Sequence, residues 1–239
     1  MARDAAWLRS RAVPDGFHPP LEEYLRAIYE LEEEGVDVIR ARLAERLHHT
    51  PAAVTEMVRR LVAEGDLQVE GRAIRMTAEG KRRARSVVRR HRLAERLLTD
   101  VIGLPWSRAH VEAGRWEHVI SEEVEQRLVA LLDDPATCPH GNPIPGSHAE
   151  RRPVRSLAAA VTGERVVLER VSETVEEDLD TLCYLDAHGF RPGAAATVTG
   201  RAPDGTLTLE VEIEGKGGTG HGTIAVGAGL AAQLDIAAG

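Results

Sequence analysis

The stretch HRLAERLLTDVIGLPWSRAHVEAGRWEH, residues 91–118, decides how this sequence is organised. His91 and Glu95 are four residues apart, so they share one face of a helix that we expect to begin near Val87. A Gly-Leu-Pro run at 103–105 interrupts that helix, and a second helical run follows. One face of the second run carries His110, Gly114, Glu117 and His118.

These two helix faces predict a metal site. Imidazole and carboxylate ligands without a cluster of thiolates suit Mn(II), Fe(II), Co(II) or Zn(II) better than a structural zinc knuckle. A single His–Glu pair at this spacing is most often a surface salt bridge. Two such pairs so close together favour metal binding.

The composition is that of a globular protein. Its 239 residues are 43% hydrophobic, which is enough for two or three domains with their own cores. No run approaches the roughly 18 apolar residues of a membrane span, and residues 1–17 lack the apolar core of a signal peptide. With only two cysteines, Cys138 and Cys183, a disulfide framework is not expected. We therefore expect a cytoplasmic protein with no membrane partner.

The net charge of −8 is unevenly distributed along the chain. Residues 1–92 hold 18 Lys and Arg against 15 Asp and Glu, and the remainder holds 12 against 23. The densest cationic run is 81–92. Such a run is more often a solvated helix face. If the protein binds a phosphate-bearing partner, however, we expect the N-terminal part to contact it.

The N-terminal part has the pattern of a winged helix-turn-helix. Thr50 can cap a helix whose first residue is Pro51, and a turn at 70–72 separates two short extended pieces. The expected elements are an irregular arm over 1–20, helices over 21–35, 39–47 and 51–64, and strands over 67–69 and 73–76.

In this arrangement the helix from Pro51 to Ala63 would enter the major groove of DNA. Its N-terminal residues are the candidates for contact near base edges, namely Thr50, Ala52, Ala53, Thr55 and Glu56. The phosphate candidates are Arg40, Arg42, Arg59, Arg60 and Arg72. Winged helices also serve as protein-interaction modules, but arginines on both the helices and the wing favour DNA.

A basic helix over 81–98 leads from the wing into the metal-binding stretch. A further helix over 121–132, capped by Ser121, carries an apolar stripe of Val124, Leu128, Leu131 and Leu132. The stripe predicts a two-fold dimer interface, with an ordinary intrachain core as the alternative. Residues 133–154 form a Pro- and Gly-rich connection, in which Cys138 and His140 give only a weak metal signal.

From Glu164 the composition changes to short Val-, Leu- and Thr-rich segments broken by turns, which predicts a small β barrel. Between the first two segments, residues 176–189 predict a short helix. Its inward residues would be Leu179, Leu182 and Leu185.

The predicted fold class is therefore multi-domain α+β. It combines an N-terminal winged helix-turn-helix, a central all-α dimerisation and metal-binding domain, and a C-terminal SH3-like β barrel. The expected boundaries are 1–20 for the arm, 21–85 for the DNA-binding domain, 86–150 for the helical domain, 151–163 for a linker and 164–239 for the barrel.

Five segments together resemble the diphtheria-toxin-repressor family of iron- or manganese-dependent transcriptional regulators, in its long three-domain form. The resemblance runs from about Leu21 to the C-terminus. The segments are YLRAIYELEEEG at 24–35, RARLAERL at 40–47, HRLAERLL at 91–98, RWEH at 115–118 and GNPIPG at 141–146.

The resemblance implies two metal sites per subunit. The implied ancillary ligands are His91, Glu95, His110, Glu173 and Glu176, and the implied regulatory positions are Glu23, Gly114, Glu117 and His118. Iron-sensing members have Met and Cys where Glu23 and Gly114 stand here. Gly114 could offer only its backbone carbonyl. The loss of both sulfur ligands leaves an oxygen-rich set that favours Mn(II), with Fe(II) as the alternative.

The resemblance thus implies a homodimeric repressor of metal-ion homeostasis that binds double-stranded operator DNA when loaded with metal. It is not expected to be an enzyme. A metallohydrolase is the enzymatic alternative, but no H-E-x-x-H or nucleophile motif supports it. A metal store is the third alternative, and it would need no recognition helix.

Overall fold

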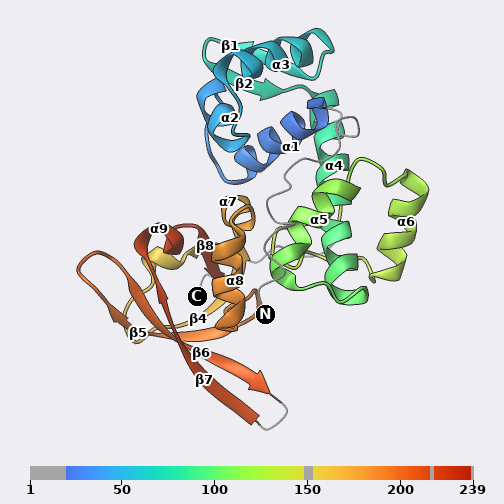
Figure 1. Cartoon of the computed structure of the whole chain (residues 1–239). Helices are drawn as coiled ribbons and strands as arrows, with labels where there is room; N and C mark the ends of the chain where they lie inside the picture. The colour runs from blue at the N-terminus through green and yellow to red at the C-terminus, as the bar shows by residue number, and fades with distance from the viewer. Residues whose placement is uncertain (1–19, 148–152, 216–217, 238–239) are drawn as a thin grey trace, which may run out of the picture. The chain divides into compact units, whose positions relative to one another are not determined.

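The computed structural model describes residues 20–147, 153–215 and 218–237 (Figure 1). They divide into two compact units. Unit 1 comprises Met1–Arg90 with Gly114–Ile120, and unit 2 comprises His91–Ala113 with Ser121–Gly239. The predicted arm lies outside the described residues apart from Pro20, which begins the first helix.

Unit 1 contains the predicted winged helix (Figure 1). Thr50 caps the third helix as expected, because its Oγ1 accepts a hydrogen bond of 3.2 Å from the backbone N–H of Ala53. The wing is an antiparallel hairpin in which Leu67 pairs with Met76. The elements are α1 (Pro20–Glu33), α2 (Arg40–Arg46), α3 (Pro51–Ala63), β1 (Leu67–Glu70) and β2 (Ala73–Met76).

The core of unit 1 joins α1 to the helix-turn-helix. Leu25 and Ile28 of α1 are fully buried with Leu43 of α2 and with Val58 and Leu61 of α3. Each such side chain contributes roughly 1.5–3 kcal/mol of hydrophobic free energy. Helix α1 is therefore packed into the DNA-binding module, so a ligand that holds α1 acts on the module as a whole.

Helix α4 (Ala78–Arg96) follows the wing and runs through the boundary between the two units. A π-helical turn, Leu97–Val101, follows it. The basic run 81–92 is not uniformly solvated, because Arg92 is 1% exposed and Arg83 forms an ion pair with the buried Asp66. The expectation that this run meets phosphate is therefore wrong for Arg92.

Two further helices follow a 3-10 turn at Trp106–Arg108. They are α5 (Ala109–Trp116), which begins in unit 2 and ends in unit 1, and α6 (Glu122–Leu131), which Ser121 caps through Val124 N–H at 3.3 Å. Leu128 of the predicted apolar stripe is buried, whereas Val124 and Leu131 are 47% and 61% exposed. The described part of unit 2 thus leaves much of this stripe uncovered.

The C-terminal part of unit 2 is a six-stranded antiparallel sheet in the order β3-β8-β4-β5-β6-β7 (Figure 1). Strand β4 pairs with β5 through its first residues and with β8 through its last, with an irregularity between Leu168 and Arg170. This exchange of partners bends the sheet around one core, which includes Leu168, Leu182 and Phe190. The small β domain predicted from the sequence is confirmed.

The strands are β3 (Val154–Ser156), β4 (Arg165–Val171), β5 (Ala195–Arg201), β6 (Leu207–Gly215), β7 (Gly218–Val226) and β8 (Leu234–Ala237). The helices are α7 (Glu173–Glu176), α8 (Leu179–Ala187) and α9 (Ala228–Ala231). Strands β3 and β8 were not predicted, and β3 lies with a 3-10 turn, Leu157–Ala159, inside the expected linker. Strands this short show too little alternation to stand out in a sequence.

Among the described residues, no helix is both long enough and apolar enough to cross a membrane.

Candidate metal centres and DNA-binding surface

The N-terminal part of α3 presents the side chains predicted to face DNA. Ala52, Ala53, Thr55 and Glu56 are exposed, while Val54 and Val58 on the opposite face are buried. Thr55 Oγ1 donates a 2.8 Å hydrogen bond to Pro51 O, so its hydroxyl group is engaged within the helix. The exposed edge of α3 is therefore small and partly apolar.

Cations surround that edge, and the structure shows which are engaged. Arg42 forms an exposed ion pair with Glu45 at 3.3 Å, Arg59 with Glu56 at 2.5 Å and Arg60 with Glu64 at 3.1 Å. Such exposed pairs are worth little, so they can exchange for phosphate. Arg40 is half-buried, and Arg72 on the wing is exposed.

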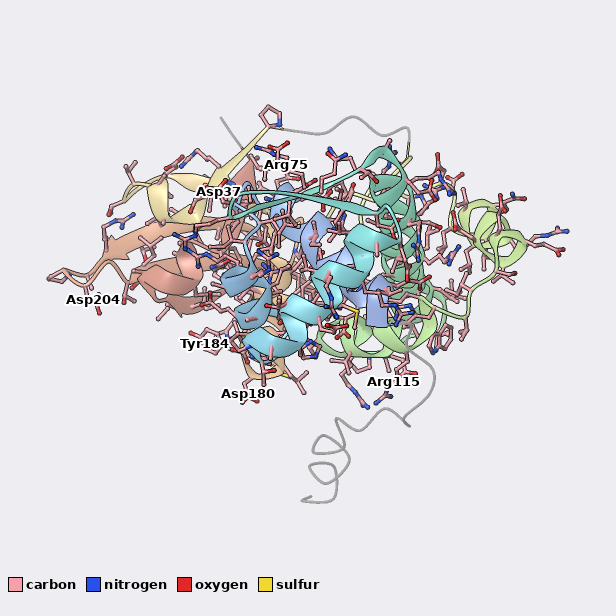
Figure 2. All side chains as sticks on the ribbon, turned by 90° about the horizontal axis from the view of Figure 1, so that it is seen from above. Asp37, Arg75, Arg115, Asp180, Tyr184 and Asp204 are labelled. Atoms are coloured by element: carbon pink, nitrogen blue, oxygen red, sulfur yellow. The ribbon has the colours of Figure 1, made fainter. Side chains whose placement is uncertain are left out.

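Sequence reasoning missed one cation of the wing. Arg75 projects from β2 (Figure 2) and its side chain is 68% exposed, 3.6 Å from Glu70. The alternation of β2, in which Ile74 and Met76 are buried, could have identified it.

The first candidate metal centre lies within unit 1. His118 Nδ1 is 2.7 Å from Glu22 Oε2 of α1, and its Nε2 is 3.2 Å from Glu117 Oε1. The side chains of His118 and Glu117 are 3% and 2% exposed. A residue on α1 and two residues beyond α5 thus form one cluster, although their sequence separation is large.

Two of the positions predicted as ligands at this centre, Glu23 and Gly114, need separate comment. Glu22, the neighbour of the predicted Glu23, supplies the carboxylate in contact with His118, and Glu23 itself is half-buried. At Gly114 a Cβ atom would meet no atom within 4 Å. The position therefore has room for a side chain, and its own contribution is limited to the backbone.

The second candidate centre lies within unit 2 and is more closely assembled. Glu95 Oε1 is 3.2 Å from both His91 Nε2 and His110 Nδ1, and Glu176 Oε2 is 2.9 Å from His110 Nδ1. Glu173 Oε2 is 4.0 Å from His110 Nδ1. The structure thus brings all five predicted ancillary residues together, from helices α4, α5 and α7.

Sequence reasoning gave Cys138 and His140 little weight, yet the structure places both in this cluster. His140 is fully buried, with its Nδ1 3.3 Å from Glu95 Oε1 and 3.2 Å from Glu176 Oε2. Arg96 holds the loop through hydrogen bonds to Thr137 O and Cys138 O. The sequence showed the C-x-H spacing of these two residues. Only the fold shows that they face the carboxylates of Glu95 and Glu176.

Burial and neighbouring charge act on the pKa values in opposite directions. Burial, with the repulsion of Glu173, raises the pKa of Glu176 to about 7. Burial would raise the pKa of Glu173 as well, but the Arg92 guanidinium 2.8 Å away lowers it to about 2. His110 is buried, yet the carboxylates of Glu176 and Glu95 raise its pKa well above the ordinary value.

The residues of the unit 2 cluster fit a divalent cation. Two buried carboxylate oxygens, Glu95 Oε2 and Glu173 Oε2, have no hydrogen-bond partner, and Glu176 Oε2 faces the imidazoles of His110 and His140. Unpartnered buried carboxylate oxygens are costly unless a cation compensates them. Imidazole and carboxylate donors are those that Mn(II), Fe(II), Co(II) and Zn(II) accept.

A winged helix combined with clusters of imidazole and carboxylate ligands defines a class, the metal-dependent DNA-binding regulators. Family profiles agree with this class along most of the chain. "Iron dependent repressor, N-terminal DNA binding domain" matches residues 17–73, "Iron dependent repressor, metal binding and dimerisation domain" matches 77–146, and "FeoA domain" matches 155–238.

Curated relatives and solved structures agree as well. The iron-dependent repressor IdeR of Mycobacterium leprae is 47% identical over 79% of this chain and 86% of its own length. The diphtheria toxin repressor of Corynebacterium diphtheriae is 43% identical over 79% and 87%. A structure titled "Manganese-dependent transcriptional repressor complex with manganese" is 28% identical with a TM-score of 0.80, covering 91% of this chain and 99% of that one.

The chain belongs to the diphtheria-toxin-repressor family of metal-dependent transcriptional repressors. Its relatives and structural neighbours are repressors and not enzymes, so the metallohydrolase alternative is wrong.

Proposed function

We propose that this repressor binds operator DNA as a homodimer when Mn(II) occupies the cluster of Glu22, Glu117 and His118, with Glu23 and the Gly114 carbonyl as further ligands. The observation that carries the proposal is the contact of both His118 ring nitrogens with carboxylates, Glu22 on α1 and Glu117 beyond α5. A divalent ion would bind these carboxylates and the imidazole together and so hold the two segments more firmly.

The link from metal to DNA is the packing of α1. Leu25 and Ile28 of α1 are buried against the helix-turn-helix, so an ion that holds α1 reduces the freedom of α3. In the proposed dimer, the two recognition helices must stand about 34 Å apart to occupy successive major grooves. Metal binding selects that arrangement because the metal-loaded protein has fewer accessible positions of α1, and therefore of α3, than the metal-free protein.

The choice of Mn(II) rests on the ligand types at this centre. Two adjacent carboxylates at Glu22 and Glu23, with no sulfur at Gly114, make a hard and oxygen-rich set. Fe(II) is the second candidate, favoured by the iron-dependent repressors that are 47% and 45% identical to this chain. In vitro, Zn(II) or Co(II) can bind more tightly than either, since affinity follows the Irving–Williams order.

The unit 2 cluster has a supporting role in this proposal. Its proposed ligands are His91, Glu95, His110, Glu173 and Glu176. The side chains of Cys138 and His140 lie in the same cluster, which supports them as further ligands. An ion there would tie α7 to helices α4 and α5, and so stabilise unit 2. The exposed Val124 and Leu131 of α6 are the proposed contacts of the dimer, because apolar side chains of this kind favour a two-fold interface.

The experiment is anaerobic retention of sheared genomic DNA by the purified chain, with sequencing of the retained fragments. It is run with Mn(II), with Fe(II) and with a chelator. We expect one palindromic site to be retained with metal and lost with chelator. The lower midpoint concentration, compared with the cellular level of each metal, identifies the signal. Equal retention in all three conditions would contradict the metal switch.

Three variants assign the effect to the proposed ligands. Glu117→Ala should abolish metal-dependent retention, and Glu173→Ala should only shift the midpoint. Glu32→Ala, an exposed carboxylate on α1, is the matched control and should behave as the parent protein. A Glu117→Ala midpoint equal to that of the parent would overturn the site assignment.

A further inference from the structure

Tyr24 joins helix α1 to the turn that precedes the recognition helix. Its side chain is 1% exposed, and its hydroxyl lies 2.8 Å from His49 Nδ1. The two rings are tilted by 38°, with centroids 5.6 Å apart. Tyr24 belongs to the apolar core of unit 1, so this hydrogen bond is a directional contact among contacts that are mostly non-directional. It fixes where α1 lies relative to one particular side chain of the turn.

The backbone of this turn is held by α2. His48 has a φ of +52°, and its N–H faces Glu45 O at 3.4 Å. The N–H of His49 donates to Ala44 O at 3.1 Å. These two bonds form the Schellman motif that ends many helices. Helix α2 therefore sets the backbone of His49 and α1 sets its ring, while the next residue, Thr50, caps α3.

The contact with Tyr24 leaves the other ring nitrogen of His49 as a donor. When the Tyr24 hydroxyl donates to Nδ1, the neutral imidazole carries its proton on Nε2. If the ring is protonated, Nδ1 donates to the hydroxyl instead, and Nε2 still carries a proton. Nε2 has no hydrogen-bond partner among the described residues, and the side chain is half-buried. The ring is thus held in place with one donor unused.

The position of this donor suits a phosphate. No acidic residue occurs between Glu45 and Glu56, a run that contains the turn and the start of α3. In helix-turn-helix proteins the second helix enters the major groove, so the turn before it lies near the sugar-phosphate backbone. Hydrogen bonds from side chains to phosphate oxygens there fix the register of the protein on the duplex.

The tyrosine is also next to the candidate metal centre of unit 1. It directly follows Glu22 and Glu23, the two proposed carboxylate ligands on α1. Glu22 Oε2 lies 2.7 Å from His118 Nδ1. Successive residues of a helix lie about 100° apart, so the carboxylates and the ring leave one short segment of α1 in different directions. An ion that holds the carboxylates therefore also holds the Tyr24 hydroxyl in position against His49.

We infer that Tyr24 is a positioning residue, which holds the His49 ring so that Nε2–H donates to a phosphate oxygen of operator DNA when metal holds α1. The inference rests on the proposed metal-dependent function and names a contact through which the metal centre acts on the DNA-binding surface. Without metal, α1 has more freedom, so ordering the ring against phosphate costs more conformational entropy. Metal and phosphate thus favour the same position of α1, and each should bind more tightly when the other is present.

The test measures DNA affinity by fluorescence anisotropy, in Mn(II) and in chelator, with the duplex recovered in the retention experiment. Tyr24→Phe keeps the buried ring and removes only the hydroxyl. We expect the ratio of the two affinities to fall about fivefold, because DNA affinity falls in Mn(II) and stays the same in chelator. A ratio equal to that of the parent would overturn the inference.

A double-mutant cycle shows whether the two residues act through each other. His49→Ala should lower the ratio by about as much, and Tyr24→Phe combined with His49→Ala should be no worse than either change alone. Additive losses would contradict the inference. If Tyr24→Phe fails to fold, His49→Ala at its half-buried position decides the matter. An equal loss of affinity in Mn(II) and in chelator would then show that the His49 contact does not depend on metal.

Two further measurements separate this role from simpler ones. Tyr184→Phe removes a hydroxyl of unit 2 that bonds both the N–H and the C=O of Ala225, and it should keep the ratio even if it lowers stability. Calorimetric titration of Tyr24→Phe with Mn(II) alone should give an affinity within about twofold of the parent, since the hydroxyl is not a ligand. A large loss there would show that Tyr24 acts on the metal centre itself and would refute its positioning role. A parent whose DNA affinity does not respond to metal would instead overturn the proposed function, and the inference with it.

Discussion

Arg26 Nε lies 3.6 Å from Glu117 Oε1, so an arginine of α1 is a counter-charge for a proposed metal ligand. The same nitrogen is 3.6 Å from Glu30, and Glu30 is 3.7 Å from Arg46 of α2. Glu117 and Glu30 are almost fully buried. A row of alternating charges therefore joins the metal centre to the first helix of the helix-turn-helix.

A divalent ion bound by Glu117 and His118 must share Glu117 with the Arg26 guanidinium. Removing that positive charge relieves a like-charge repulsion, so Arg26→Gln should raise the affinity of this centre for Mn(II) by roughly tenfold, or about 1.4 kcal/mol. Arg26→Lys keeps the charge and should stay near the parent value. Calorimetric titration of the metal-free chain measures both, and weaker binding by Arg26→Gln would contradict the argument.

Gly114 offers a second way to alter the same centre. A Cβ there meets nothing within 4 Å, so Gly114→Cys should fit and add a thiolate donor. Sulfur favours softer ions, so the Co(II) midpoint of DNA binding should fall by about tenfold or more relative to the Mn(II) midpoint. Gly114→Ala is the control. It should leave both midpoints unchanged, while helix propensity adds up to about 1 kcal/mol of stability. Unchanged metal preference in Gly114→Cys would show that the position does not face the ion.

The winged helix could be predicted from the sequence because each of its helices and strands is marked by a local sequence pattern. Thr50 and Pro51 mark a helix start, and the turn before Ala73 marks a hairpin. The family resemblance named the residues of the ancillary cluster, and the structure brings them together. The helix predictions rest on helical spacing, which fixes which side chains share a face, whereas the roles of these residues as ligands stay predictions.

Other features depend on contacts that no local pattern encodes. His140 joins the cluster only because a Pro- and Gly-rich loop folds back onto α4, where Arg96 binds its carbonyls. Arg92 reads as one cation in a basic run, yet Glu173, 81 residues further along the chain, pairs with it. Strand β3 is visible only as the partner of β8. Each of these is set by tertiary packing.

The loop that carries Cys138 and His140 depends on Gly141. Its φ of +90° is strained for other residues, and a Cβ there would overlap the carbonyl oxygen of Glu169. Gly141→Ala should therefore lower the free energy of unfolding by more than about 3 kcal/mol. Gly163, with φ of +89° and no neighbour within 4 Å, is the control, and Gly163→Ala should cost only about 1 kcal/mol. Urea unfolding compares the two, and equal losses would show that the close approach is unimportant.

The wing supplies a test of how DNA is held. Arg72 and Arg75 are exposed on the hairpin, so each should contact phosphate rather than bases. Arg72→Ala should weaken specific and non-specific binding alike and reduce the slope of log K against log salt by about 1. Arg191→Ala, which removes an exposed arginine of unit 2, should leave the slope unchanged. Fluorescence anisotropy at several salt concentrations measures the slopes, and an unchanged slope in Arg72→Ala would remove the wing from the interface.

Proton release should accompany metal binding in unit 2. Burial and the nearby Glu173 raise the pKa of Glu176 to about 7, and the carboxylates of Glu176 and Glu95 raise the pKa of the buried His110 above its ordinary value. Without metal, both groups therefore carry protons when the pH is below about 7, and both must lose them to become ligands. The affinity of the cluster should rise with pH through that value, and it should keep rising above it, less steeply, until His110 has also lost its proton.

The measurement is calorimetric titration of Glu117→Ala with Mn(II), because this variant isolates the unit 2 cluster. Repeating it in buffers of different ionisation enthalpy gives the number of protons released per ion. We expect up to two below about pH 7 and fewer above it, since Glu176 is then already ionised. Glu176→Gln should release about one proton fewer than its parent at the lower pH. Proton release that does not change with pH would show that Glu176 is already ionised in the metal-free cluster, held so by the histidines around it.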